Sequence, residues 1–97
     1  MSKAFKALAH PMRRTILNLL KDGPKASGDF AEVFDVSWPT VTSHLNVLKE
    51  AELVSTERRG NSVVYSLNAS VLEEVALGLF DLIGRAEAQE KAKKDLT

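Results

Sequence analysis

The chain has no cysteine, so disulfide bonds, thiolate metal ligands and thiol redox switches are excluded within its 97 residues. Long apolar runs are missing as well. The longest early run, Ile16 to Leu20, is interrupted by Asn18, and nothing approaches the roughly 20 apolar residues of a membrane span. We therefore expect no export signal, no insertion into a membrane and a cytoplasmic location.

An excess of charge of one sign is also absent. Thirteen basic and 13 acidic side chains give zero formal charge, which argues mildly against nonspecific coating of nucleic acid. A local basic patch is compatible with this balance, since residues 1–60 carry nine basic and seven acidic side chains and residues 61–97 carry four and six. With 44% apolar and 27% charged residues, the composition indicates a single globular domain over residues 1–97.

The middle of the chain predicts two helices joined by a short turn. Ser27 is expected to cap the first of them, with Asp29 in its first turn. Ser37 is expected to cap the second, with Pro39 in the first turn, where a proline is tolerated. A short helix, a turn and a second helix over residues 27–50 form the pattern of a helix-turn-helix.

The rest of the chain completes a mostly helical protein with a small β-hairpin. Ser70 and Glu73 form a capping-box pattern at the start of the last helix, and Arg59-Gly60-Asn61 is a hairpin signal between two β-branched runs. The expected elements are helices over 2–9 and 11–21, strands over 53–58 and 62–67, and a helix over 70–88 followed by a frayed tail at 89–97. The order α-α-α-α-β-β-α is that of a winged helix-turn-helix whose wing covers residues 53–68.

The helix expected over residues 37–50 has an outward face that is almost free of charge. At about 100° per residue, Val41, Leu45 and Leu48 fall on one stripe, which is typical of a side that faces the core. No charged residue occurs from Ser37 to Leu48, and the opposite side collects small hydroxyl, amide and apolar groups. They are Pro39, Thr40, Ser43, Asn46 and Val47, with Thr42 on the border. Such a face suits base edges in the major groove of double-stranded DNA.

Three segments resemble the ArsR/SmtB family of bacterial winged-helix repressors. They are FKALAHPMRRTILNLL at residues 5–20, SWPTVTSHLNVLKEAELV at residues 37–54 and RRGNSVVYSLN at residues 58–68. The combination of LAHPxRRxIL with SxHLxxLxxAxLV is specific, and without cysteine the chain looks most similar to the SdpR-like autorepressor branch. The resemblance implies a transcriptional repressor that binds an inverted-repeat operator as a homodimer and regulates its own gene.

In that family the dimer joins through the terminal helices, here residues 1–9 and 70–88. The two reading helices would then enter successive major grooves about 34 Å apart. The residues themselves favour the same assembly, because the last predicted helix is more apolar than one small core can cover, and a second copy would cover the excess.

Two departures from the family pattern bear on function. Family members commonly have glycine where this chain has Glu52, so the exit of the reading helix is expected to be tighter or differently shaped. The metal sensors of the family carry a CxC pair in the third helix or histidine and carboxylate pairs in the last helix, and neither is present. We expect His10 to be a helix-end group, no metal and no cofactor, and therefore no thiolate metal sensing.

DNA contact is expected from the reading helix, the wing and the start of the second helix. The candidate residues are Ser37, Trp38, Pro39, Thr40, Thr42, Ser43, His44, Asn46, Arg58, Arg59 and Arg14. Trp38 contacts DNA or else packs against Phe34. His44 is a packed or capping group or, as the resemblance implies, lies near phosphate. One of Arg13 and Arg14 is expected to face phosphate and the other to form an ion pair, and the sequence leaves open which.

Competing classes of function stay open at this point. A protein-interaction module on the same scaffold is favoured by the zero net charge and disfavoured by the paired wing arginines. An enzyme is not expected, because no nucleophile–base pair, paired carboxylates or glycine-rich phosphate loop is visible. A small molecule, pH, a protein anti-repressor or autoregulation without a ligand are all open as the signal, and the SdpR-like resemblance leans toward a protein partner.

Overall fold

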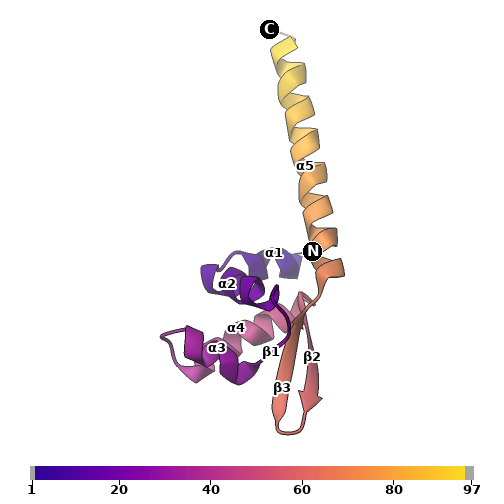
Figure 1. Cartoon of the computed structure of the whole chain (residues 1–97). Coiled ribbons are helices and arrows are strands. Elements are labelled where there is room, and N and C mark those ends of the chain that lie inside the picture. The colour runs from indigo at the N-terminus through magenta and orange to yellow at the C-terminus, as the bar shows by residue number, and fades with distance from the viewer. Residues whose placement is uncertain (1, 96–97) are drawn as a thin grey trace.

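The computed structural model describes residues 2–95 and has four short helices, a three-stranded sheet and one long helix (Figure 1). The elements are α1 (Ser2–Leu8), α2 (Pro11–Leu20), β1 (Lys25–Ala26), α3 (Ser27–Val33), α4 (Trp38–Glu50), β2 (Val54–Arg59), β3 (Ser62–Leu67) and α5 (Ala69–Asp95). Apart from β1, this is the predicted order. The helix-turn-helix is α3–α4, and the β2–β3 hairpin forms the wing.

The core lies between α2, α3, α4 and the base of the sheet. The stripe predicted on α4 is confirmed, since Val41, Leu45 and Leu48 are all buried, with 0%, 1% and 0% of their surface exposed. Phe30 of α3 is fully buried and meets the Tyr65 ring of β3 edge-on, with centroids 6.2 Å apart. The buried stripe therefore fixes which side of α4 faces outward.

The sheet has β3 in the centre, with β1 and β2 paired antiparallel on either side. Arg59 pairs with Ser62, so the wing turns on two residues, Gly60 and Asn61. Gly60 has a φ of 60°, as the first central position of a tight hairpin requires. The first wing strand covers Val54–Arg59 rather than 53–58, a shift of one residue. β1 was not predicted, because two residues are too short to show alternation.

Two helix starts differ from the prediction by one residue. α3 begins at Ser27, so the capping position is Ala26, whose N–H donates to the Asp29 carboxylate at 3.0 Å. The carboxylate thus satisfies the end of the helix in place of the expected Ser27 hydroxyl. α5 begins at Ala69, where the Leu72 N–H donates to the carbonyl of residue 68, so Ser70 lies inside the first turn instead of capping it.

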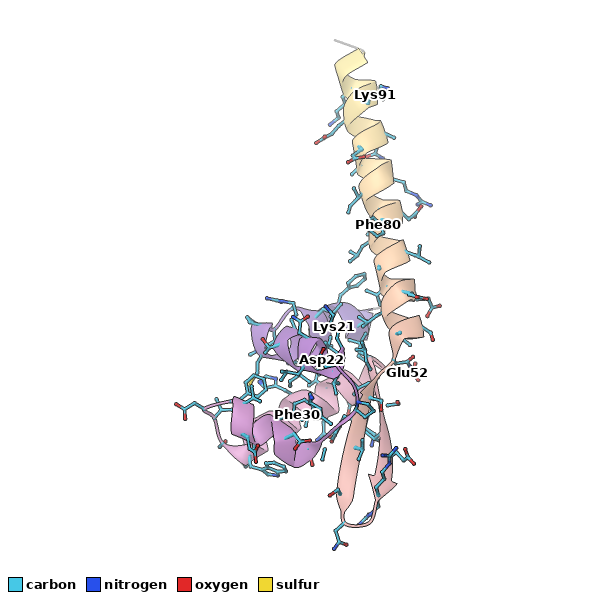
Figure 2. The ribbon with its side chains drawn as sticks, in the orientation of Figure 1. Lys21, Asp22, Phe30, Glu52, Phe80 and Lys91 are labelled. Carbon is cyan, nitrogen blue, oxygen red and sulfur yellow. The ribbon has the colours of Figure 1, made fainter. Side chains whose placement is uncertain are left out.

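The end of α4 is a Schellman motif built on a strained residue. The N–H of Glu52 donates to the Lys49 carbonyl at 3.0 Å and that of Leu53 donates to the Leu48 carbonyl at 3.1 Å. Glu52 takes the left-handed conformation this motif needs, with a φ of 61°, and no other non-glycine residue in the described range has a positive φ. Its own carbonyl accepts from Asn68 Nδ2 at 3.0 Å. The sequence departure noted above therefore sits where glycine is favoured on steric grounds, at the base of the wing (Figure 2).

Replacing Glu52 with glycine is expected to raise the free energy of unfolding by about 1 kcal/mol. The substitution removes the steric cost of a Cβ in the left-handed region, which outweighs the extra freedom of glycine in the unfolded chain. The bond from Asn68 survives, because it ends on a backbone carbonyl. Urea denaturation at fixed protein concentration measures the change, with Glu57→Gly in the wing as a control that should destabilise. A Glu52→Gly variant less stable than the parent chain would contradict the strain.

α5 projects far beyond the rest of the molecule (Figure 1). It continues as a helix to Asp95, further than the expected end at residue 88, so residues 89–95 are helical and residues 96 and 97 lie outside the described range. Within that range, no helix combines the length and the apolar character that crossing a membrane requires, α5 included. The radius of gyration is 17.3 Å, against about 12–13 Å for a compact chain of this length, and the difference reflects this arm.

Candidate nucleic-acid interface

The outward face of α4 is made of short polar and apolar side chains, as predicted. Ser43 lies opposite the buried stripe and is exposed, as are Asn46, Thr40 and Pro39. Thr42 lies on the border and is partly buried. The structure thus presents the hydroxyls and the amide of this helix together on one accessible surface, which is defined here as the reading face.

Two hydroxyl side chains, those of Ser37 and Thr40, lie at the N-terminal end of α4. Ser37 caps the helix, since its Oγ accepts from the Thr40 N–H at 3.4 Å. The same Oγ lies 2.9 Å from Thr40 Oγ1, so the two hydroxyls share a hydrogen bond. Ser37 therefore has a clear structural role, whereas Thr40 keeps capacity for a further partner. Trp38 beside them has 47% of its surface exposed, more than packing in the core would leave.

The C-terminal end of α4 is acidic. A cavity of about 440 Å³ opens there, and the carboxylates of Glu50, Glu52 and Glu74 line it with Lys3. Like charges repel a phosphate backbone, and the helix dipole also places its negative end here. An anionic partner is thus attracted to the N-terminal half of α4, from Ser37 to Asn46, and repelled from the other end.

Arg13 of α2 ties three helices together behind the reading face. Its guanidinium donates to the carbonyls of Ala7 at 2.7 Å and Lys6 at 2.8 Å, which satisfies the end of α1. A third nitrogen lies 3.3 Å from Nδ1 of His44 on α4. Because a guanidinium only donates, this His44 nitrogen is the acceptor. The Arg13 side chain is therefore held in place by three partners and is partly buried.

Arg14 plays a similar part, since its NH1 donates to the Leu8 carbonyl at 2.6 Å. One of the two arginines was expected to form an ion pair, and this part of the prediction is wrong. Among the described residues neither Arg13 nor Arg14 pairs with a carboxylate. Both hold the last carbonyls of α1 instead. Arg14 is exposed, so its contact with DNA stays a prediction.

His44 and His10 stack against each other, with ring centroids 4.3 Å apart and planes tilted by 48°. His10 also caps α2, because its Nδ1 accepts from the Met12 N–H at 3.1 Å, which confirms the expected helix-end role. Burial above all, and then the charges of His10 and Arg13, lower the pKa of His44 below its ordinary value of 6.5. The neutral ring is the form that fits this contact.

Stability is expected to fall as the pH is lowered from about 7.5 to about 5.5. Since the folded-state pKa of His44 is lowered, the unfolded chain binds the proton more readily, so this contribution is complete above about 6.5 and is lost as the pH falls below it. Unfolding in urea at several pH values measures the slope. His44→Gln keeps an acceptor for Arg13 but has no proton to gain, so its slope should be shallower, and an unchanged slope would contradict the assignment.

The wing presents its two arginines on opposite faces. Successive strand residues alternate, so Arg59 shares a face with Glu57 while Arg58 lies on the other. Arg59 and Glu57 form an exposed ion pair with a nitrogen–oxygen distance of 3.2 Å. Arg58 has no such partner among the contacts of the described residues. Treating the two as one basic pair missed this difference, although strand alternation was the signal for it.

The described part of the chain holds no cluster of three or more His, Asp and Glu side chains placed to bind a metal ion. The role of Arg13, by contrast, could not be found from the sequence. Its partner His44 lies 31 positions away, and a bond of that span leaves no periodic signal.

Comparison with known proteins gives concordant findings. The family described as bacterial regulatory protein, arsR family, matches residues 10–56. The transcriptional repressor SdpR of Bacillus subtilis is 42% identical over 90% of this chain and 97% of its own. An ArsR-like transcriptional regulator from Rhodococcus sp. RHA1 shares the fold with a TM-score of 0.86 at 24% identity, covering 99% of this chain and 91% of the other.

A homodimeric winged helix-turn-helix DNA-binding domain from Mycobacterium bovis, of a possible ArsR-family regulator, has a TM-score of 0.69 at 29% identity. The alignment covers 89% of this chain and 81% of that one.

Proposed function

Because the chain belongs to the arsR family of bacterial regulatory proteins, we propose that it is a repressor that binds an inverted-repeat operator as a homodimer. The observation that carries the proposal is the reading face of α4, which is uncharged, polar and exposed beside an otherwise charged surface. The N-terminal half of α4 would enter the major groove, with Ser43 and Asn46 at the base edges. The wing would follow the backbone or the minor groove.

The dimer would form through α5 and α1. Beyond its first turns α5 carries large apolar side chains that are exposed in the described part of the chain: Leu77, Leu79, Phe80, Leu82 and Ile83. Phe80 projects from the helix well away from the domain (Figure 2). Phe5 of α1 is also exposed, at 37%. An apolar surface of this extent is typical of a protein interface, and a second copy offers the same surface in return.

Regulation of its own gene, without a thiolate metal signal, completes the proposal. The 97 residues contain no cysteine, and the relative SdpR is a repressor by name. A reporter fused to the promoter of the chain's own gene tests autoregulation, since expression should rise when the gene is deleted. A protein anti-repressor is proposed as the releasing partner.

Selection of bound sequences from random duplex DNA tests the central claim, followed by anisotropy titration of the enriched sequence at two salt concentrations. We expect an inverted repeat with half-sites about one helical turn apart, roughly 34 Å. A folded dimer that enriches no sequence would contradict the proposal and would direct the search to a protein bound by the reading face.

Replacing Arg58 with alanine is expected to weaken binding to all DNA sequences alike. A phosphate contact adds affinity without sequence information, so the slope of log K against log salt should become shallower by about 0.9. Arg85→Ala is the matched control, because Arg85 is an exposed arginine on α5, paired with Asp81 and away from the wing. Equal salt slopes for Arg58→Ala and Arg85→Ala would remove Arg58 from the interface.

A further inference from the structure

The reading face has a composition that restricts which base pairs it can recognise. Ser43 lies at its centre, with Asn46 toward the C-terminus and Pro39 toward the N-terminus, whereas Val47 is partly buried against the core. No Lys or Arg occurs between Ser37 and Leu48. Lys49 follows, but it lies about 120° around the helix from Ser43 and so points away from the centre of the face.

Guanine and adenine present different hydrogen-bonding groups in the major groove, so they are recognised by different side chains. Guanine presents two acceptors, N7 and O6, which a side chain with two donors such as Arg or Lys recognises, whereas adenine presents one acceptor and one donor. The Asn46 amide offers one donor and one acceptor and matches adenine. The hydroxyls of Ser43 and Thr40 serve either base, and the exposed, apolar Pro39 suits the methyl group of thymine.

The nearest guanidinium cannot supply the missing donors. Arg13 lies behind α4, where it donates to the carbonyls of Ala7 and Lys6 and to His44. Freeing it would leave the Ala7 carbonyl at the end of α1 without a partner, while the Lys6 carbonyl would keep the Ala9 N–H. The side chain with two donors that reads guanine through both acceptors is thus absent from residues 37–48 of α4 and is not provided by Arg13.

We propose that the base pair that α4 reads through two hydrogen bonds in each half-site is A·T, with Asn46 contacting adenine and Pro39 contacting a thymine methyl. This inference rests on the proposed function, because it names the operator class of the same site. The restriction applies to the positions under α4 only. Base pairs outside them are contacted through phosphate and carry no such requirement.

The experiment compares selections from random duplex DNA by the full chain and by Asn46→Ala, with Asn18→Ala as the control. Asn18 is an exposed amide on α2, so this control removes the same group outside the reading face. We expect the parent chain and Asn18→Ala to enrich the same inverted repeat. Asn46→Ala should lose preference at one position per half-site, and that position should be A·T. Exchanging it for G·C should weaken the parent chain about 5- to 100-fold and Asn46→Ala much less.

Deoxyuridine, which lacks only the thymine methyl, tests the second part. Replacing the half-site thymines one at a time should lower affinity by about fourfold at one or more positions. No loss at any thymine would overturn the methyl contact. An enriched repeat with G·C at the position sensitive to Asn46 would overturn the inference while leaving the repressor intact. A folded dimer that enriches nothing would overturn both.

Discussion

Replacing Ile83 with aspartate is expected to convert the dimer into monomers and to reduce operator affinity by at least about 100-fold. Ile83 lies on α5 with 51% of its surface exposed in the single chain, on a stripe continued by Leu79. Each copy of the dimer would bury one such side chain, worth about 1.5–3 kcal/mol, and the substitution adds the desolvation of two carboxylates. A monomer holds only one reading helix and loses the second half-site.

Analytical ultracentrifugation over a range of concentrations measures the dimer, and anisotropy measures the affinity for the operator. Gln89→Asp is the matched control, since it adds the same charge to the exposed distal part of α5, where polar residues prevail. Circular dichroism verifies that both variants keep their helices. An Ile83→Asp chain that sediments as a dimer would contradict the interface proposed for α5.

Replacing Phe30 with alanine is expected to lower the free energy of unfolding by about 3–5 kcal/mol. Phe30 is fully buried and its ring meets Tyr65 edge-on, so the change removes apolar burial, leaves a cavity and deletes the aromatic contact. The loss is a large part of the roughly 5–15 kcal/mol that stabilises a typical domain. Because α3 packs against α4 through this region, DNA binding should fall with the folded fraction.

Urea denaturation followed by circular dichroism at fixed protein concentration measures this change. Val33→Ala on the same helix is the control, because Val33 has 57% of its surface exposed and should change stability by less than about 0.5 kcal/mol. A loss below about 1.5 kcal/mol for Phe30→Ala would mean that the site collapses around the smaller side chain and that Phe30 is not the centre of the core.

The sequence was sufficient to predict those elements that show a repeating pattern of apolar residues or a recognisable turn. The stripe of Val41, Leu45 and Leu48 repeats at helical spacing, so it predicted both the core side of α4 and its outward face. The β2–β3 hairpin was similarly predictable from its turn residues and β-branched runs. The same helical period was enough to place Ser43 and Asn46 of the candidate interface on the side of α4 that faces away from the core.

Features that depend on one hydrogen bond were not predictable in the same way. At the start of α3, Ser27 and Asp29 both offer an oxygen to the backbone, and only the fold decides that Asp29 accepts from Ala26. The roles of Arg13 and Arg14 depend on where α1 ends relative to α2, which is a tertiary fact. The strand β1 exists only because β3 lies beside it, with Lys25 opposite Tyr65.

Because α5 projects from the domain, how well this helix is ordered should depend on the concentration of the protein. Residues 79–93 are all exposed in the single chain, and α5 is roughly 40 Å long at 1.5 Å per residue. A helix without tertiary contacts is only marginally stable in water. In the proposed dimer, ordering of the arm and pairing of two chains would therefore be one event governed by mass action. The melting temperature should then rise with protein concentration. A cell that holds few copies would hold chains with a frayed arm, and repression would begin steeply as the copy number grows.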